Sequence, residues 1–477
     1  MSFKKQAVLG IKWNSFSQFG KQGIQLLTSI VLARLLQPSD FGLVAMAAVL
    51  TGFIAIFSDL GTSAAVIQRK NLSENLLSSI FWVNVAFGVL TMAILFTISP
   101  LVSLFYGEPR VSAILKALSL TFFISGFSAL HQTMLVRDLT FDKLAKIEIT
   151  AALLGSISGI CSAMLGSGVW SLVVQSLVSV MTTTALLWLT SSWKPGFMFH
   201  WHEIKTVSNY SLNLTGFNIF NYFARNADNL LVGRYLGAQA LGYYNLAYVI
   251  MMYPLQNVSH IIGRVMFPFY SQIQNDNASF RSIYLKMAAA IATVTFPMML
   301  GLMVVAKPLI LTVFGVQWSP MILVLLILSP VGMAQSILHT LGNIYQAKAR
   351  TDILFRWGVF SGILVVISFM IGLRWGIVGV ASAYALTVAL LAYPNFAIPF
   401  RLIGLRVREL WMVLLRPLAS SLVMFAVLVG LKSILSPSLS NVLILVILIP
   451  TGIVLYLLTS WNINREHMLE LVRYVKE

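Results

Sequence analysis

Apolar runs recur along the whole of this 477-residue chain, and polar residues gather in short segments between them. A run of about 20 residues can cross a bilayer as a helix, because every backbone group is then hydrogen-bonded within the segment. The runs are continuous rather than alternating, which disfavours a transmembrane barrel. We therefore expect an all-α polytopic membrane protein with fourteen transmembrane helices. The predicted helices span residues 11–36, 41–68, 76–105, 111–136, 143–166, 169–190, 206–235, 240–272, 283–314, 319–346, 353–373, 376–400, 409–432 and 439–460.

Composition supports this interpretation. Hydrophobic residues make up 58% of the chain and charged residues 10%, with a mean hydropathy of +0.86, whereas a soluble domain is about 25% charged. Linkers such as QPSD, GEPR and QNDNAS are too short to form a soluble domain. The longest polar interval, SSWKPGFMFHWHEIK at 191–205, carries aromatic residues that suit a membrane–water interface.

Positive charge predicts the orientation. With the N-terminus in the cytoplasm, twenty-one of the 32 Lys and Arg residues fall in cytoplasmic segments and seven on the opposite side. We therefore expect both termini in the cytoplasm. The same bias explains most of the +17 net charge, so we expect no nucleic-acid partner. The first helix is expected to be retained, since no cleavage site follows its basic start.

The sequence repeats itself. VLARLLQPSDFG (31–42) corresponds to LVGRYLGAQALG (231–242) at an offset of 200 residues. Farther along, the offset becomes 208: SPLVSLFYG (99–107) corresponds to KPLILTVFG (307–315), and GVWSL (168–172) to GIVGV (376–380). We predict two parallel six-helix repeats followed by two extra helices, an arrangement that in transporters places substrate between the repeats. The predicted segments are an N-terminal lobe at 1–192, an interfacial linker at 193–205, a C-terminal lobe at 206–402, an extra helix pair at 403–461, and a cytoplasmic amphipathic tail at 462–477.

The first helix of each predicted repeat carries a polar stripe. In each copy the polar positions step by three or four residues, so they share one helical face. At the 200-residue offset the two stripes coincide, which favours the facing walls of one aqueous cavity. The alternative is two buried polar seams that join helices. The predicted substrate-binding residues are Gln18, Lys21, Gln25, Asn218, Asn221, Arg225, Asp228 and, in the next helix, Arg264.

The charges of this set indicate the substrate. Lys21, Arg225 and Arg264 outnumber Asp59 and Asp228, and a mildly positive cleft attracts phosphate. The amide side chains beside them suit a glycan. Asp59 and Asp228 are also candidates for coupling to H⁺ or Na⁺, because acids inside a membrane are usually functional. Asp228 could instead neutralise Arg225, three residues away.

Two further arginines and several smaller features have simpler interpretations. Arg34 and Arg234 are expected to reach the membrane interface rather than the substrate. His200, His202 and Glu203 have metal-ligand spacing but no further ligands nearby, so we expect no metal and no cofactor. His131 and His339 are expected to be packing or interface residues, with proton relay as the alternative. Gly155 and Gly159 have the spacing of a helix-packing motif.

With ARLLQPSDFG after the first helix, GIVGVASAYAL at the start of the twelfth, and the expected helix count, the chain resembles the polysaccharide-exporter branch of the multidrug/oligosaccharidyl-lipid/polysaccharide superfamily. The resemblance is greatest to Wzx-type flippases of lipid-linked oligosaccharides, including colanic acid exporters. It implies a V-shaped pair of lobes in the bacterial inner membrane, and a monomer that turns an undecaprenyl-pyrophosphate-linked repeat unit from the cytoplasmic to the periplasmic leaflet. Cavity arginines of related lipid II flippases bind the pyrophosphate. Arg264 is the match here, and Lys21 takes the place of an arginine absent from the second helix.

Two rival functions follow from the same residues. A multidrug and toxin exporter, coupled to an ion gradient, would favour acids in its cavity, whereas bases exceed acids here. A polysaccharide polymerase or ligase would need a sizeable periplasmic loop, and none of the outer linkers is large. We therefore expect a transporter rather than an enzyme.

Overall fold

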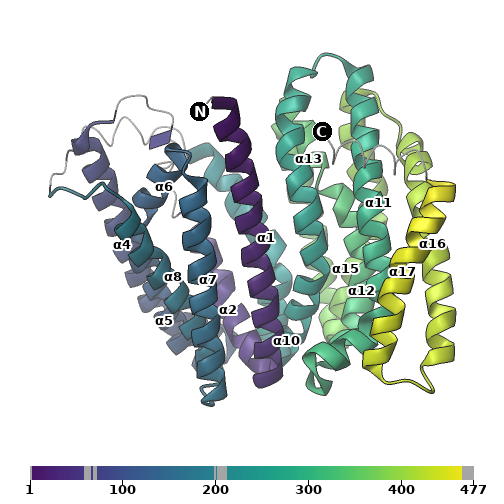
Figure 1. The fold of residues 1–477 in the computed structure, drawn as a ribbon, viewed down its shortest axis with the longest axis horizontal. Helices are drawn as coiled ribbons and strands as arrows, with labels where there is room; N and C mark the ends of the chain where they lie inside the picture. Colours follow the sequence, from purple (N-terminus) through teal and green to yellow (C-terminus); the bar gives the residue numbers. More distant parts are fainter. Residues whose placement is uncertain (1–2, 58–65, 68–71, 198–199, 201–211, 465–477) are drawn as a thin grey trace. The chain divides into compact units, whose positions relative to one another are not determined.

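The protein is helical throughout the part that the computed structural model describes (Figure 1). The described residues are 3–57, 66–67, 72–197, 200 and 212–464. Within these ranges the side chains of residues 3–12, 14–15, 212–221 and 256–269 are not described. The described residues contain no strand, so the all-α prediction is confirmed for them.

Two compact units divide the chain, Met1–Gly242 and Tyr243–Glu477, here called unit 1 and unit 2. Unit 1 contains α1 (Phe3–Leu35), α2 (Pro38–Ala55), α4 (Glu74–Tyr106), α5 (Arg110–Gly126), α6 (Ala129–Arg137), α7 (Phe141–Met164), α8 (Trp170–Thr190) and the first part of α10 (Leu212–Gln272). The lobe boundary expected from the sequence, between 205 and 206, lies outside the described residues. The division into six-helix lobes, linker and tail stays a prediction.

Unit 2 begins within α10, whose helix is interrupted at Gly237 by backbone angles of φ 84° and ψ 176°. This interruption lies in the gap expected between the helices at 206–235 and 240–272. The remaining elements are α11 (Asn277–Leu309), η1 (Ile310–Phe314), η2 (Val316–Trp318), α12 (Met321–Leu338), α13 (Leu341–Ala347), α14 (Thr351–Gly372), η3 (Leu373–Trp375), α15 (Gly376–Ile403), α16 (Val407–Leu435) and α17 (Asn441–Ile463).

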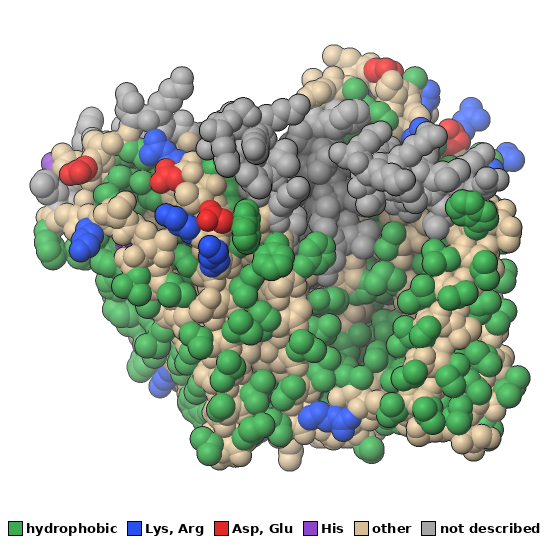
Figure 2. Space-filling view, viewed as in Figure 1, with side chains coloured by type: hydrophobic (Ala, Val, Ile, Leu, Met, Phe, Trp, Pro, Cys, Tyr) green, Lys and Arg blue, Asp and Glu red, His purple; other side chains and the backbone are tan. Residues whose placement is uncertain are grey.

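Nine helical stretches within the described residues are long and apolar enough to cross a membrane, and one bent pair could form a tenth span. The protein is therefore a multi-pass membrane protein, while the number fourteen stays a prediction. On the face of unit 1 seen in Figure 2, most charged side chains lie toward one edge and apolar side chains cover the middle. This distribution is what a lipid-facing surface requires.

The helix predicted at 111–136 is instead a bent pair. α5 and α6 meet at an angle of 46° around Phe127 and Ser128. The indole Nε1 of Trp188 donates to the backbone oxygen of Phe127 at 2.9 Å. A donor from α8 thus satisfies a carbonyl at the bend, which lets the helix break inside an apolar stretch.

Glycines recur with positive φ at the offset of the sequence repeat. Gly107 and Gly315 both adopt positive φ, as do Gly168 and Gly376, and each pair is 208 residues apart. Positive φ at equivalent places supports an internal repeat, while ψ differs within the first pair, at 25° for Gly107 and 169° for Gly315.

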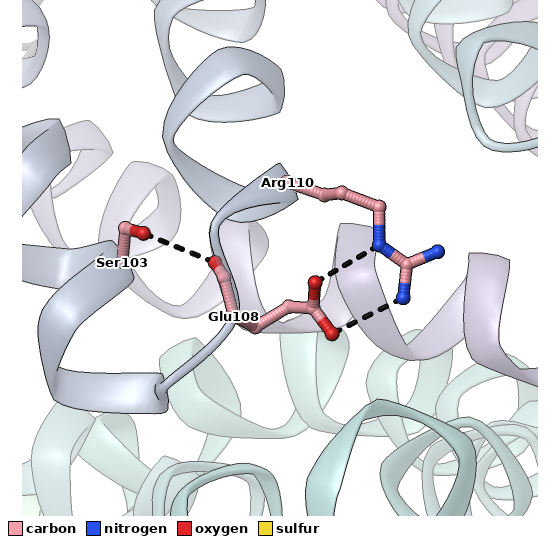
Figure 3. Close-up of polar contacts among 3 residues, drawn as sticks. All are labelled: Ser103, Glu108 and Arg110. Atoms are coloured by element: carbon pink, nitrogen blue, oxygen red, sulfur yellow. Dashed lines mark hydrogen bonds and ion pairs between the residues drawn. The ribbon is translucent and has the colours of Figure 1, made fainter.

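The first of these turns joins α4 to α5 and is closed by polar side chains (Figure 3). The Ser103 hydroxyl donates to the Glu108 backbone oxygen at 3.1 Å. Arg110 contacts both carboxylate oxygens of Glu108, with its Nε at 2.9 Å from Oε1 and its Nη2 at 3.1 Å from Oε2. These bonds lower the pKa of the Glu108 carboxyl.

The repeated motif of residues 31–42 and 231–242 forms a reciprocal helix crossing inside unit 1. A Cβ added to Gly42 would lie 1.7 Å from the backbone oxygen of Ala238, and one added to Gly242 would lie 1.9 Å from that of Pro38. Exchanging 38 with 238 and 42 with 242 turns one contact into the other, so the contact has local two-fold character. We call this contact the glycine crossing. Only glycine lets the two backbones approach so closely.

Glycines also set the packing of α7 on α8. A Cβ on Gly155 would lie 2.8 Å from the Gln175 backbone oxygen, and one on Gly159 would lie 2.8 Å from the Gln175 Cβ. The expected helix-packing role of this glycine pair is confirmed.

In unit 2, α16 and α17 supply hydrogen-bond donors to α11. Pro297 and Pro308 lie inside α11 and lack an N–H group, which deprives the carbonyls of Thr293 and Val304 of their usual partners. The Tyr456 hydroxyl of α17 donates to the Thr293 oxygen at 2.6 Å. The Lys432 ammonium of α16 donates to the Val304 oxygen. Both proline interruptions are therefore satisfied from the extra helix pair.

Candidate functional site

The polar stripe of α1 is partly exposed. Gln18 and Gln25 are exposed and Lys21 is half-buried, whereas Thr28, at the edge of the stripe, is buried and donates to the Ile24 backbone oxygen at 2.7 Å. Lys21 makes no hydrogen bond or ion pair with any residue that the structure describes. The stripe therefore presents two exposed amides and an ammonium that has no acidic partner among the described residues.

A carboxylate that the sequence reasoning missed adjoins this stripe. Ser17, only 3% exposed, donates from its hydroxyl to Oε2 of Glu148 in α7 at 2.7 Å. One turn farther along α1, a Cβ on Gly20 would lie 3.3 Å from the Ile149 side chain. α1 thus packs on α7 (Figure 1). The contacts at Ser17 and Gly20 lie next to Lys21 along α1.

Beside its predicted polar stripe, α10 packs against α2 through Tyr222 and Phe223. The Tyr222 hydroxyl donates to the Val49 backbone oxygen at 2.7 Å, and the Tyr222 and Phe223 rings lie 6.0 Å and 4.7 Å from that of Phe53. A Cβ on Gly52 would lie 2.4 Å from the Tyr222 hydroxyl oxygen. Because these contacts fix the helix on one side, Arg225 is left exposed on another.

Arg225 and Asp228 do not form the ion pair that was one of two alternatives. Asp228 is 4% exposed, and its Oδ1 accepts a hydrogen bond from the Asn229 backbone at 2.8 Å. Arg225 has no ion pair within the described part of the chain. Its side chain is exposed, a position in which a guanidinium suits an anion.

The structure does not describe the side chains of four predicted site residues. Asp59 lies outside the described residues. Asn218 and Asn221 lie in α10 within the segment whose side chains are not described, and Arg264 lies in a second such segment of the same helix. Their roles stay predictions.

Glu148 changes the charge balance of the site. The named cations were Lys21, Arg225 and Arg264 against two acids, and Glu148 brings the acids to three. The excess of bases that argued against a multidrug exporter is therefore gone. Each of the two described cations, Lys21 and Arg225, still suits an anion, since neither makes an ion pair with a described residue.

Arg234 follows the predicted stripe residues of α10 in sequence and is not one of them. Its guanidinium carbon is 5.8 Å from the centre of the Phe105 ring, and the side chain is exposed. A cation over an aromatic ring at a helix end is consistent with the expected interfacial position.

His131 is fully buried among aromatic rings. The rings of Trp188, Trp193 and Phe81 lie 4.9, 5.5 and 6.2 Å from the imidazole. Neither of its nitrogens has a hydrogen-bond partner in the described structure. These contacts agree with the expected packing role. Its predicted equivalent, His339, is exposed, so the two positions differ.

Gly196 and His200, which follow α8, are hydrogen-bonded to α4. Trp82 Nε1 donates to the Gly196 oxygen at 2.9 Å, and the backbone N–H groups of Gly196 and His200 donate to the hydroxyls of Ser78 and Ser79. The other members of the metal-like spacing, His202 and Glu203, lie outside the described residues. No group of potential metal ligands occurs among the residues that are described.

Comparison with known proteins places the chain in a family. Residues 31–323 match the family described as "Polysaccharide biosynthesis protein". The chain is 30% identical over 393 residues to the lipopolysaccharide biosynthesis protein WzxC of Escherichia coli, covering 81% of this chain and 79% of that protein. It is also 30% identical over 367 residues to the teichuronic acid biosynthesis protein TuaB of Bacillus subtilis, covering 76% of each chain.

A solved structure shares the fold. The lipid II flippase MurJ in an inward closed conformation aligns with a TM-score of 0.74 at 16% identity, covering 96% of this chain and all of that one. At that identity the likeness shows the fold alone. With the family match covering more than half of the sequence, this chain belongs to the polysaccharide biosynthesis protein family, in agreement with the resemblance found in its sequence.

Proposed function

We propose that this protein is a flippase that moves undecaprenyl-pyrophosphate-linked oligosaccharide repeat units from the cytoplasmic to the periplasmic leaflet of the bacterial inner membrane, for exopolysaccharide, capsule or O-antigen synthesis. The observation that carries the proposal is the family membership, supported by relatives named for polysaccharide biosynthesis and by the MurJ-like fold. Transport proceeds by alternating access, as internal repeats in transporters permit.

The polar stripes supply the chemistry of this proposal. Lys21 and Arg225 bind the diphosphate, with Arg264 as the expected third cation, and the exposed amides of Gln18 and Gln25 bind sugar hydroxyls. An exposed arginine matches a phosphate through two parallel hydrogen bonds, while a lysine acts as a point charge. Asn218 and Asn221 complete the same faces.

The membrane arrangement belongs to the proposal as well. It has fourteen spans in a six-plus-six-plus-two order and both termini in the cytoplasm, and the protein works as a monomer. Asp59 and Asp228 are the candidates for coupling to H⁺ or Na⁺. If the rate of transport changed neither when the ion gradient was removed nor in the Asp228→Asn variant, the proposal that Asp228 couples transport to ions would be wrong.

The test is a deletion strain complemented with variants. Loss of the gene should leave the lipid-linked glycan on the cytoplasmic leaflet, measured by its accessibility in inside-out vesicles. Loss of a polymerase would instead leave single repeat units outside. Arg225→Ala and Arg264→Ala should reduce export without reducing the amount of protein in the membrane.

A matched control is Arg374→Ala, which removes an exposed arginine from η3, outside the stripes. Export should be normal in this control. Normal export in the Arg225→Ala, Arg264→Ala double variant would contradict the assignment of these arginines to the diphosphate.

A further inference from the structure

Glu148 has an unusual position for a carboxylate inside a predicted membrane span. It lies two turns from the start of α7, and its described hydrogen bond is the one that it accepts from Ser17 of α1 at 2.7 Å. Its second oxygen, Oε1, accepts no hydrogen bond from a described residue. A carboxylate held by one hydroxyl retains most of its capacity to attract a cation.

Among the described side chains of α1, Lys21 is the cation nearest in sequence to Ser17. It follows Ser17 by four residues on α1, so the Cβ atoms of the two residues are about 6 Å apart on one face of the helix. The Lys21 side chain is half-buried and makes no hydrogen bond or ion pair with a described residue. Its flexible stem can carry the ammonium either toward Glu148 or toward a ligand on the exposed face beside Gln18 and Gln25.

Few other charged side chains near Glu148 could pair with its carboxylate in place of Lys21. α8, which packs closely on α7, contains no ionisable residue. On α7 itself, Lys146 is exposed and Lys143 lies nearer the helix start. From α6, which also packs on α7, the ionisable side chains are the enclosed His131 and Arg137 at the helix end. On α1, the side chain of Lys12 is not described.

We propose that Glu148 is an internal counter-ion for Lys21, which competes with the diphosphate of the substrate for the same ammonium. Lys21 and Glu148 form no ion pair in the structure, so the competition belongs to release: the ammonium turns toward Glu148 as the diphosphate leaves, and away from it when the diphosphate binds. This inference rests on the proposed function, since it takes Lys21 to bind that diphosphate. A transporter must release what it binds, and a built-in competitor weakens binding enough to permit release.

Binding of undecaprenyl diphosphate to the purified full-length protein in nanodiscs tests the proposal. Glu148→Gln keeps the shape of the side chain and removes its charge, so affinity should rise about tenfold, as for the loss of one partly screened charge interaction. Lys21→Met should lower affinity. In the Lys21→Met background, Glu148→Gln should then change affinity by less than about twofold, because its effect acts through the ammonium.

Two further variants sharpen the result. Ser17→Ala frees Glu148 to pair with Lys21, so affinity should fall about threefold, opposite in sign to Glu148→Gln. Glu74→Gln makes the same chemical change at an exposed residue in the first turn of α4, and should leave affinity unchanged. Flipping measured in proteoliposomes should be slower in Glu148→Gln despite its tighter binding.

Several outcomes would overturn the proposal. One is that Glu148→Gln raises affinity equally in the unaltered protein and in the Lys21→Met background. A second is that Glu74→Gln raises affinity as much as Glu148→Gln does. A third is that Glu148→Gln binds undecaprenyl diphosphate no more tightly than the unaltered protein. If the unaltered protein neither binds undecaprenyl diphosphate nor flips the glycan lipid, the proposed function fails first. In that case Lys21→Met would also have no effect, which distinguishes this failure from the others.

Discussion

Two turns 200 residues apart, Gln37–Gly42 and Gly237–Gly242, change the direction of the chain at equivalent places by different chemistry. In the first, α1 ends and α2 starts anew with Pro38, and the Asp40 carboxylate accepts a hydrogen bond from the Gln37 backbone at 3.0 Å. In the second, Gly237 alone makes the turn by adopting a φ of 84°. The first turn is stabilised by side chains and the second by the conformational range of one glycine.

What the two turns share is the glycine crossing that follows each of them. Gly42 and Gly242 each meet a backbone oxygen from the opposite copy. Divergence has altered how each turn is made, while the residue that permits backbone contact is glycine in both. The comparison therefore separates local turn chemistry, which can vary, from helix contact, which leaves no space for a side chain.

The largest expected effect comes from filling the crossing. Gly42→Ala or Gly242→Ala places a Cβ within 2 Å of a carbonyl oxygen, so the helices must separate at a cost of about 1–3 kcal/mol. Thermal unfolding in detergent should show a clearly lower Tm for each variant. Gly23→Ala in α1 is the control, since nothing lies within 4 Å of its added Cβ. An unchanged Tm for both crossing variants would contradict the close contact.

The next effect concerns the second turn alone. Gly237→Ala meets no atom within 4 Å, so its cost is conformational rather than steric. Holding alanine at φ 84° and ψ 176°, in a region that essentially only glycine occupies, costs about 1–3 kcal/mol. The free energy of unfolding should fall by this amount, without the added steric cost of a crossing variant. If Gly237→Ala lowered the free energy of unfolding as much as Gly242→Ala, the distinction between a conformational cost at Gly237 and a steric cost at Gly242 would be wrong.

The first turn should be less sensitive. Asp40→Ala removes the carboxylate that closes the start of α2, at a cost of about 1 kcal/mol. Asp40→Asn keeps an oxygen acceptor and should recover much of the loss. The comparison is made by denaturant or thermal unfolding of both variants beside the unaltered protein.

The smallest effect is expected at the Gly107 turn, where Arg110 holds the pKa of Glu108 below its ordinary value. Because the folded-state pKa is lowered, the pair stabilises the protein above the unfolded pKa, and this contribution is lost as pH falls through the folded pKa. The Arg110 side chain is 57% exposed and that of Glu108 is 23% exposed, so solvent screens the pair and it is worth less than about 1 kcal/mol. Glu108→Gln should lower Tm slightly at pH 7, and the difference from the unaltered protein should vanish in acid.

The helical fold was predictable because apolar runs such as those of α4 and α17 leave a chain in lipid few alternatives. The break between α5 and α6 was not, since Phe127 and Ser128 are both acceptable inside a helix. The carbonyl of Phe127 at the break accepts a hydrogen bond from Trp188, a donor that is distant in sequence. The 200-residue offset identified Gly42 and Gly242 as equivalent positions, but equivalence does not imply that they touch.

The candidate site was predictable where spacing alone decided it. The step of three or four residues placed Gln18, Lys21 and Gln25 on one face, which the structure leaves at least partly open. Glu148 was missed because it lies near the polar start of a predicted helix, where an acid is unremarkable. Only its contact with Ser17 brings it to the stripe. The spacing of Arg225 and Asp228 permitted an ion pair, and tertiary contacts decided against it.

Helices α16 and α17 have a consequence for how such a chain can be shortened. Tyr456 and Lys432 donate hydrogen bonds to carbonyls that Pro297 and Pro308 leave without partners in α11. A version ending at Ile403 would keep α11 yet leave these two carbonyls without hydrogen bonds in a lipid environment. The C-terminal pair is therefore not an optional addition, and the prolines in α11 and the donors in α16 and α17 can be lost only together.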